Sequence, residues 1–382
     1  MGNGNIGPRG AKVESLLKEM GKNKRLCHLI KTDKDLFIGI RYDSVNLYYM
    51  GASAGKITKT SQKLKYEFSP GYWKSESEKP ADIEAFLDNV DLVKKNIKKY
   101  QNGETGNGKK REKIAQQAMV CANNKNSDAK WFCIDMEYVM SQTDRSQLKF
   151  GRFDIVAITK EKQRDNGKYG VALIELKHGC GAYGVNATKY HAITDQNIIK
   201  DIIALNYQEN VFGCGITGHV YSYLQYLTYD KPVEGYKNAY DLLKHEIVNI
   251  VTKNNSFGLK CPIPNEINVE EIEERPKVYF ITVGENVEKA KIQMKKYLFN
   301  GAKASSMNVE LILKEENMKK MRDYDFNFYF SEANKFGDDK IIKDIINDES
   351  YTKESMRPSH RLCKPPERCK IESTDQEVLF YG

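Results

Sequence analysis

Three residues near the middle of the chain have types and spacing that suit hydrolysis of a phosphate ester. They are Asp154, in the segment RFDIVAITK, and Glu175 and Lys177, in the segment KYGVALIELK. Carboxylate oxygens are ligands that Mg²⁺ prefers, and a magnesium site usually keeps waters and accepts oxygens of a substrate phosphate. A lysine beside such a site can orient or help deprotonate the attacking water, and can offset charge in the transition state.

Two expected strands position these residues, joined by the charged turn EKQRDNG. If the turn is centred near residue 165 or 166, Asp154 falls opposite residues 176–178 of the second strand. Because side chains alternate along a strand, Glu175 and Lys177 then point to the same side. The three residues are therefore expected to gather at the open end of one hairpin.

The segment GCGAYG, directly after the second strand, suggests a competing site. Its glycine spacing matches a dinucleotide-binding turn. Such a site needs a parallel strand that stays apolar up to the first glycine and an acid that ends another strand about 20 residues later. Here the strand ends in Glu-Leu-Lys-His, and the later segment QNIIKDIIALN predicts a helix. A dinucleotide-dependent oxidoreductase is therefore disfavoured, and the glycines are expected to connect the strand to the next helix.

Composition is that of a globular protein with a basic surface. A chain of 382 residues suggests about two units. The formal net charge of +8 points to a polyanionic partner such as nucleic acid, although a solvated lysine surface gives the same total. Eight cysteines without a C-x-x-C pair, and no recognisable leader, predict reduced thiols in a cytoplasmic protein. No run approaches 18 apolar residues, so no membrane span is expected.

The expected elements divide the chain into three parts. Residues 1–105 are expected to form an accessory N-terminal element, and residues 106–333 a core. The tail over 334–382 is polar and then basic. The N-terminal element has a helix at 11–20, an antiparallel meander over 36–73 and a helix at 80–100, whereas the core has a helix at 111–124 and strands at 130–140, 152–158, 169–177, 277–283 and 308–313. The predicted class is α/β: a mixed sheet flanked by helices, with an appended N-terminal antiparallel β element.

The segments RFDIVAI and VALIELKHG together resemble the PD-(D/E)XK nuclease superfamily, which has the restriction-endonuclease-like fold. The resemblance covers about residues 110–200, extending to the strands over 277–313, and departs where Phe153 replaces the superfamily's proline. The wider set REKIAQQ, WFCIDMEYVM, GRFDIVAI and IELKHGCGAYGVNATKYH is similar to an uncharacterised bacterial group within this superfamily. The resemblance implies that Asp154 and Glu175 are metal ligands, that Lys177 is catalytic and that Glu137 is an additional metal-binding acid.

Other candidates also have structural explanations. Glu112 lies early in a helix, where acidic residues are favoured for helix stability alone. Asp135 is expected to share a face with Glu137 on an apolar strand. Lys189 and His191 follow the glycines, where they are candidates for phosphate contact or proton transfer, although a helical histidine is usually structural or solvated. Gln116 and Gln117 are expected on a helix surface.

A basic segment near the C-terminus, RPSHRLCKPPERCK, is the candidate nucleic-acid contact. Cations there would release counterions from a phosphate backbone, which makes binding salt-dependent. The residues concerned are Arg357, Arg361, Lys364 and Arg368.

The sequence thus predicts a nuclease that depends on Mg²⁺ (or Mn²⁺) and hydrolyses phosphodiester bonds, with DNA favoured over RNA as substrate. No organic cofactor and no membrane contact are expected, and cutting both strands of a duplex would favour a homodimer. The alternative is a catalytically silent nucleic-acid-binding or scaffold protein on the same fold. Nucleic-acid binding that does not depend on a divalent metal would favour the alternative.

Overall fold

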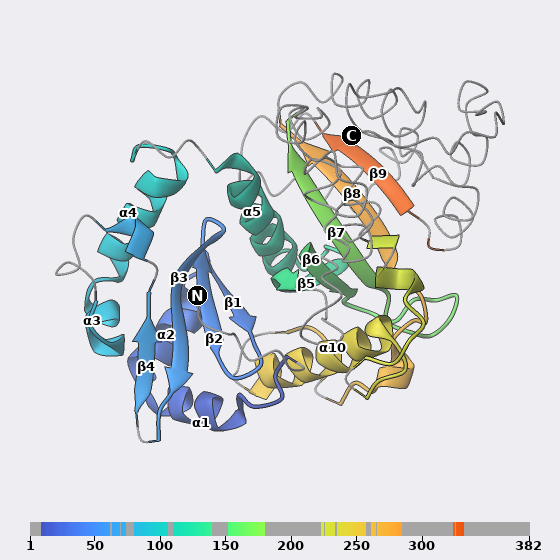
Figure 1. Ribbon diagram of the computed structural model, residues 1–382, viewed down its shortest axis with the longest axis horizontal. Helices are drawn as coiled ribbons and strands as arrows, with labels where there is room; N and C mark the ends of the chain where they lie inside the picture. The colour runs from blue at the N-terminus through green and yellow to red at the C-terminus, as the bar shows by residue number, and fades with distance from the viewer. Residues whose placement is uncertain are drawn as a thin grey trace, which may run out of the picture.

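Two β-sheets with helices between and around them make up the fold. The computed structural model describes residues 9–61, 63–68, 70–73, 80–105, 110–139, 152–179, 223–224, 226–233, 235–256, 261–264, 266–284, 324 and 326–331. The first sheet is antiparallel and the second is mixed, as the α/β prediction required. Helix α5 (Arg111–Lys125) stands between the two sheets (Figure 1).

The N-terminal sheet is the meander that the alternating pattern predicts, in the order β1-β2-β3-β4. Met50 and Gly51 both have positive φ in the tight β2–β3 turn, and a Cβ on Gly51 would lie 2.1 Å from the Lys113 carbonyl oxygen of α5. Glycine is therefore required where the turn meets the helix. The elements are α1 (Glu14–Lys22), α2 (Lys24–Thr32), β1 (Leu36–Ile40), β2 (Val45–Tyr49), β3 (Ala52–Lys59), β4 (Leu64–Glu67), η1 (Pro70–Tyr72), α3 (Ile83–Asp88) and α4 (Val90–Gln101).

Two helical predictions in this part differ from the structure. The single helix expected over 80–100 is broken at Asn89, whose side chain donates to the Ala85 carbonyl while its backbone leaves the helical region. Asparagine competes with the helix for backbone hydrogen bonds, which explains the break. The sequence prediction omitted α2, which begins at an Asn23 side chain that accepts from the Leu26 amide at 3.0 Å.

The second sheet runs β5-β6-β7-β8-β9. Strands β5, β6 and β7 pair antiparallel, whereas β8 and β9 continue the sheet in parallel. Strand β9 was not expected from the sequence, and the strand predicted at 308–313 lies outside the described residues. The elements are α5, β5 (Trp131–Val139), β6 (Arg152–Thr159), β7 (Val171–His178), α10 (Ala239–Ser256), η5 (Val269–Glu271), β8 (Lys277–Val283) and β9 (Phe326–Ser331).

Strand β7 is buried on both faces. Val171 and Leu173 belong to a core that also includes α10 and the N-terminal unit, whereas Ile174 and Leu176 pack in a core with α5. A strand covered on both sides reads as a nearly continuous apolar run. The charged Glu175 is therefore an exception that needs a compensating partner.

An ion cluster made of Arg9, Arg41 and Asp135 joins the N-terminal unit to β5. The Asp135 carboxylate is fully buried and lies 3.0 Å from Arg9 Nε and 2.5 Å from Arg41 Nη1. Burial would lower the pKa of Arg41, but the charge of Asp135 raises it above its usual value. The Asp135 ion cluster thus holds charged groups inside the junction.

A second buried acid at this junction makes stability depend on pH. Burial raises the pKa of Glu246, on α10, to about 7, although it accepts hydrogen bonds from the Tyr138 hydroxyl and the Arg9 amide. The Glu246 proton is bound more tightly in the folded protein than in the unfolded chain. Its contribution to the free energy of unfolding is therefore full below pH 4.5 and is lost as pH rises through 7. Between pH 4.5 and 8, the free energy of unfolding of wild type, measured with urea, should fall by about 3 kcal/mol more than that of Glu246→Gln. Parallel pH profiles for the two proteins would contradict this.

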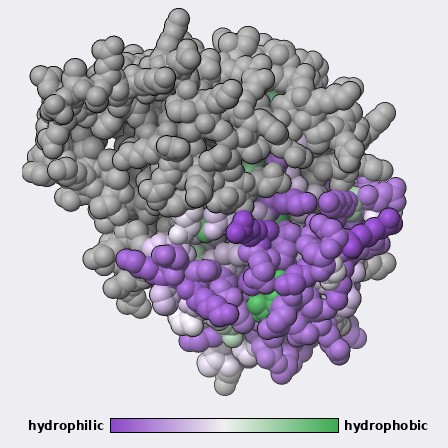
Figure 2. Space-filling view, turned by 90° about the vertical axis from the view of Figure 1, so that its right-hand side faces the viewer, coloured by the Kyte–Doolittle hydropathy of each residue, from purple (hydrophilic) through white to green (hydrophobic). Residues whose placement is uncertain are grey.

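One face of the described part is mostly polar. Figure 2 shows the described portion of one face as mostly hydrophilic with few apolar side chains. None of the helices in the described ranges is long and apolar enough to cross a membrane.

Candidate functional site

The β6–β7 hairpin brings the predicted site residues Asp154, Glu175 and Lys177 together at its open end. Pairing runs from Ile158↔Val171 to Ile155↔Ile174, so the next position places Asp154 opposite Glu175. The sequence placed Asp154 opposite residues 176–178 because the turn was centred one residue too late. The Asp154 carboxylate nevertheless reaches Leu176, whose amide donates to Oδ2 at 2.8 Å.

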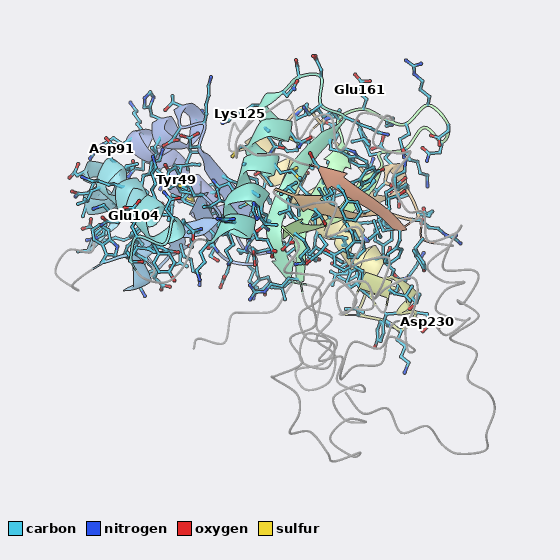
Figure 3. All side chains as sticks on the ribbon, turned by 90° about the horizontal axis from the view of Figure 1, so that it is seen from above. Tyr49, Asp91, Glu104, Lys125, Glu161 and Asp230 are labelled. Carbon is cyan, nitrogen blue, oxygen red and sulfur yellow. The ribbon has the colours of Figure 1, made fainter. Side chains whose placement is uncertain are left out.

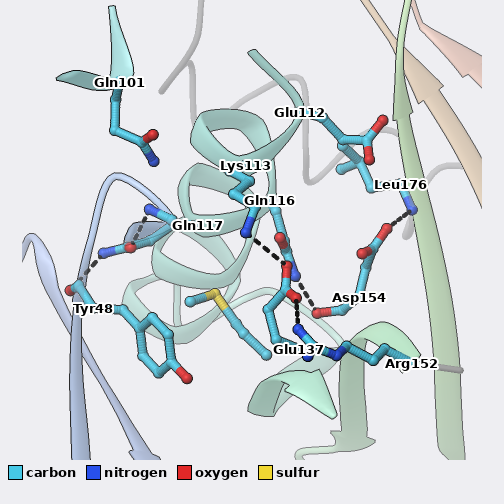
Figure 4. Close-up of polar contacts among 12 residues, drawn as sticks. Tyr48, Gln101, Glu112, Lys113, Gln116, Gln117, Glu137, Arg152, Asp154 and Leu176 are labelled. Carbon is cyan, nitrogen blue, oxygen red and sulfur yellow. Dashed lines mark hydrogen bonds and ion pairs between the residues drawn. The ribbon is translucent and has the colours of Figure 1, made fainter. Parts of the chain in front are cut away.

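Glu175 and Lys177 form a buried ion pair beside Asp154. The distance from Lys177 Nζ to Glu175 Oε1 is 2.6 Å, and their side chains are only 7 % and 1 % exposed, respectively. Helix α5 adds Glu112 from its first turn, with Oε1 3.3 Å from the same Nζ (Figure 4 shows Glu112 above Asp154). The cluster therefore combines three carboxylates and one ammonium from two strands and a helix.

Electrostatics in this cluster raise the pKa values of both Asp154 and Lys177. Burial raises the pKa of Asp154 well above its usual value, and the neighbouring Glu175 raises it further. Burial would lower the pKa of Lys177, but Glu175, Asp154 and Glu112 more than offset this and raise it. Lys177 is thus held in its charged form, whereas Asp154 binds its proton more tightly than a carboxyl group in water does.

Tyr223 contacts Glu175, and no sequence pattern predicted it. Its buried hydroxyl donates to Glu175 Oε2 at 2.9 Å. Its ring packs edge-on against Phe153 at 4.6 Å, so the residue that precedes Asp154 supports this tyrosine. A tyrosine in an apolar segment is expected to belong to the hydrophobic core. Only tertiary packing brings Tyr223 next to β7.

The two glutamines of α5 are buried, contrary to the surface position expected for them. The Gln116 side-chain amide donates to the Asp154 carbonyl, which ties α5 to β6 beside the site (Figure 4). Gln117 accepts from the Gly51 amide at 2.6 Å and donates to the Tyr48 carbonyl at 3.0 Å. Buried polar groups are expected to be satisfied, as these are.

Glu137 and Asp135 do not share one environment. The Glu137 carboxylate lies 3.1 Å from Arg152 Nη1 and 3.9 Å from Lys113 Nζ, and its backbone has φ = 52°. Asp135 belongs to the ion cluster at the junction with the N-terminal unit. Of the acids predicted beyond the hairpin, Glu112 is the one with a contact to Lys177 among the described residues.

Several predicted residues lie outside the described residues. They are Lys189, His191, Arg357, Arg361, Lys364 and Arg368.

The side chains present in the cluster limit which metal ions it could bind. Within the ranges given above, no group of three or more His, Cys, Asp or Glu side chains is arranged to hold a metal ion. Of the predicted metal ligands, Asp154 and Glu175 are the two that the β6–β7 hairpin places opposite each other. Two carboxylates fit Mg²⁺, which usually takes one or two and fills its other positions with waters and substrate phosphate oxygens.

Comparisons with protein-family models, curated proteins and solved structures give no match for this chain. The functional interpretation therefore depends on the geometry and electrostatics of the cluster.

Proposed function

We propose that the protein is a nuclease of the PD-(D/E)XK type that uses Mg²⁺ or Mn²⁺ to hydrolyse phosphodiester bonds in nucleic acid. The observation that carries the proposal is the meeting of two carboxylates from adjacent strands, the half-buried Asp154 and the buried Glu175, with the buried ammonium of Lys177 beside them. Burying like charges together is costly unless a cation or hydrogen bonds compensate. A divalent cation held by Asp154 and Glu175 would supply such compensation.

In this proposal, each described residue has a distinct task. Asp154 and Glu175 would hold the metal, which, when bound, polarises the phosphate and lowers the pKa of a coordinated water. The Leu176 amide and the Tyr223 hydroxyl fix the orientations of the two carboxylates. Lys177 orients the attacking water and offsets the negative charge that develops on the phosphate.

The alternative is a catalytically silent nucleic-acid-binding protein. Its support is the 2.6 Å pair between Lys177 and Glu175, in which the lysine alone could serve as the internal counter-ion. In that case nucleic acid would bind without a divalent metal and would not be cut.

Asp154→Asn tests the proposal. The variant should lose Mn²⁺ binding in calorimetry and cleavage of plasmid, linear DNA and RNA, because a neutral amide cannot balance a cation. The asparagine oxygen can still accept from the Leu176 amide, so the thermal midpoint should be unchanged or higher. Asp165→Asn is the matched control, since Asp165 lies exposed in the turn of the same hairpin.

Wild-type cleavage and Mn²⁺ binding by Asp165→Asn, with both lost in Asp154→Asn, would support the nuclease. Undiminished cleavage by Asp154→Asn would overturn the site. Metal-independent nucleic-acid binding by wild type, with no cleavage of any substrate, would establish the silent alternative.

A further inference from the structure

Two exposed cations stand beside the candidate site. Arg152 precedes Asp154 by two positions on β6, and Lys113 follows Glu112 in the first turn of α5. Their side chains are 62 % and 52 % exposed, respectively, in contrast to the buried Lys177. Cations that remain largely in solvent beside the carboxylates of Asp154 and Glu175 are accessible to a ligand from outside.

Glu137 holds these two cations together. Its Oε2 lies 3.1 Å from Arg152 Nη1 and its Oε1 lies 3.9 Å from Lys113 Nζ, so one carboxylate bridges a strand and a helix (Figure 4). Both of its oxygens thus face cations on the described surface. A carboxylate committed in this way is a positioning group for its partners.

The backbone at Glu137 supports this assignment. Its φ of 52° is rare for a residue other than glycine, and especially so within a strand. Glu137 lies between the pairs Met136↔Ile155 and Tyr138↔Phe153, in the position that faces Asp154 across the β5–β6 ladder. Unusual backbone conformations of this kind persist where surrounding structure fixes them, often at ligand sites.

We propose that Lys113 and Arg152 form a phosphate clamp, which binds the nucleic-acid backbone next to the phosphate to be cut, and that Glu137 positions this clamp and is not a metal ligand. The inference rests on the proposed function. Carboxylates repel a polyanion, and two exposed cations at the edge of the site offset that repulsion. The Arg152 guanidinium can contact a phosphate through two parallel hydrogen bonds, whereas Lys113 acts as a point charge.

The salt dependence of binding tests the clamp without metal or cleavage. A fluorescent duplex oligonucleotide is titrated in EDTA between 50 and 200 mM salt against wild type and the double variant Lys113→Gln/Arg152→Gln. Loss of two phosphate contacts should reduce the slope of log affinity against log salt by about 1.8. A single-stranded DNA and an RNA of the same length show which backbone the clamp prefers.

The chain offers a matched control double variant, Lys125→Gln/Arg25→Gln. Lys125 ends α5 at the opposite end from Lys113 and lies 3.8 Å from Asp35 (Figure 3). Arg25 is 54 % exposed and pairs with Glu84 at 2.9 Å. This variant has the same net charge as the test variant and should keep the wild-type slope. Equal slopes in the two double variants, or no binding by wild type, would overturn the clamp.

Glu137→Gln separates positioning from metal binding. We expect its Mn²⁺ dissociation constant to stay within about twofold of wild type, while duplex affinity changes because Lys113 and Arg152 lose their shared partner. A tenfold or greater loss of Mn²⁺ affinity would make Glu137 a metal ligand and overturn its assignment. If the Lys113→Gln/Arg152→Gln variant shows a reduced salt slope but wild type cleaves no substrate, only the nuclease proposal is refuted. If wild type cleaves but the salt slope of the variant is unchanged, only the clamp is refuted.

Discussion

Replacement of Lys177 by methionine is expected to reduce nucleic-acid cleavage by about 10²–10³-fold, the loss typical when a preorganised charge is removed from a transition state. Methionine matches the length and apolar stem of lysine but carries no ammonium. The readout is the single-turnover cleavage rate in saturating Mg²⁺, which separates chemistry from substrate binding. Cleavage at the wild-type rate would remove Lys177 from the mechanism.

The same substitution should also lower metal-free stability. Lys177 Nζ lies 2.6 Å from Glu175 Oε1, and breaking a buried pair by removing one partner typically costs about 3–5 kcal/mol. Bound Mn²⁺ would replace part of the missing charge, so the metal should raise the thermal midpoint more in Lys177→Met than in wild type. A destabilised variant that gains no more from Mn²⁺ than wild type does would argue against a metal at these carboxylates.

Lys168→Met is the matched control for both measurements. Lys168 lies on the same hairpin and pairs with the mostly exposed Glu274 at 3.0 Å. Exposed pairs contribute little, so its stability and cleavage rate should stay close to wild type. A comparable loss in both lysine variants would mean that the hairpin as a whole was disturbed.

Local periodicity was enough to predict that Asp154, Glu175 and Lys177 lie together. Alternation along β7 and one tight turn placed Asp154, Glu175 and Lys177 at one end of a hairpin, and a shift of one residue in the turn did not separate them. The reason is that the three residues lie within 24 positions of one another and on adjacent strands. Short-range patterns fix such an arrangement.

The surroundings of that centre were not predictable in the same way. Glu112 and Tyr223 reach the hairpin from 65 and 48 positions away, respectively, through packing of helices against the sheet. Glu137 and Asp135 share an apolar strand two positions apart, which predicts a common face. A register shift between Cys133 and Asp135, and the positive φ at Glu137, instead send them to different partners. Bulges and positive φ at a residue other than glycine leave no periodic signal in sequence.

Asp135→Ala should be the most destabilising substitution at the junction of the two units, with an expected loss of about 3–5 kcal/mol in the free energy of unfolding. The buried carboxylate lies 3.0 Å from Arg9 Nε and 2.5 Å from Arg41 Nη1, so alanine leaves two cations without their shared partner. The exposed Asp165→Ala should change stability by no more than about 0.5 kcal/mol.

The two tryptophans of the chain can report which unit loses stability in Asp135→Ala. Trp73 follows the N-terminal sheet and Trp131 begins β5, so the variants Trp131→Phe and Trp73→Phe each leave one reporter, in different units. In wild type the two reporters should give the same urea midpoint, because one buried core extends across both units. In Asp135→Ala the Trp73 transition should move to lower urea and separate from the Trp131 transition, since the ion cluster no longer ties the N-terminal unit to β5. A uniform shift of both reporters would show that Asp135 stabilises the whole fold without specifically coupling its units.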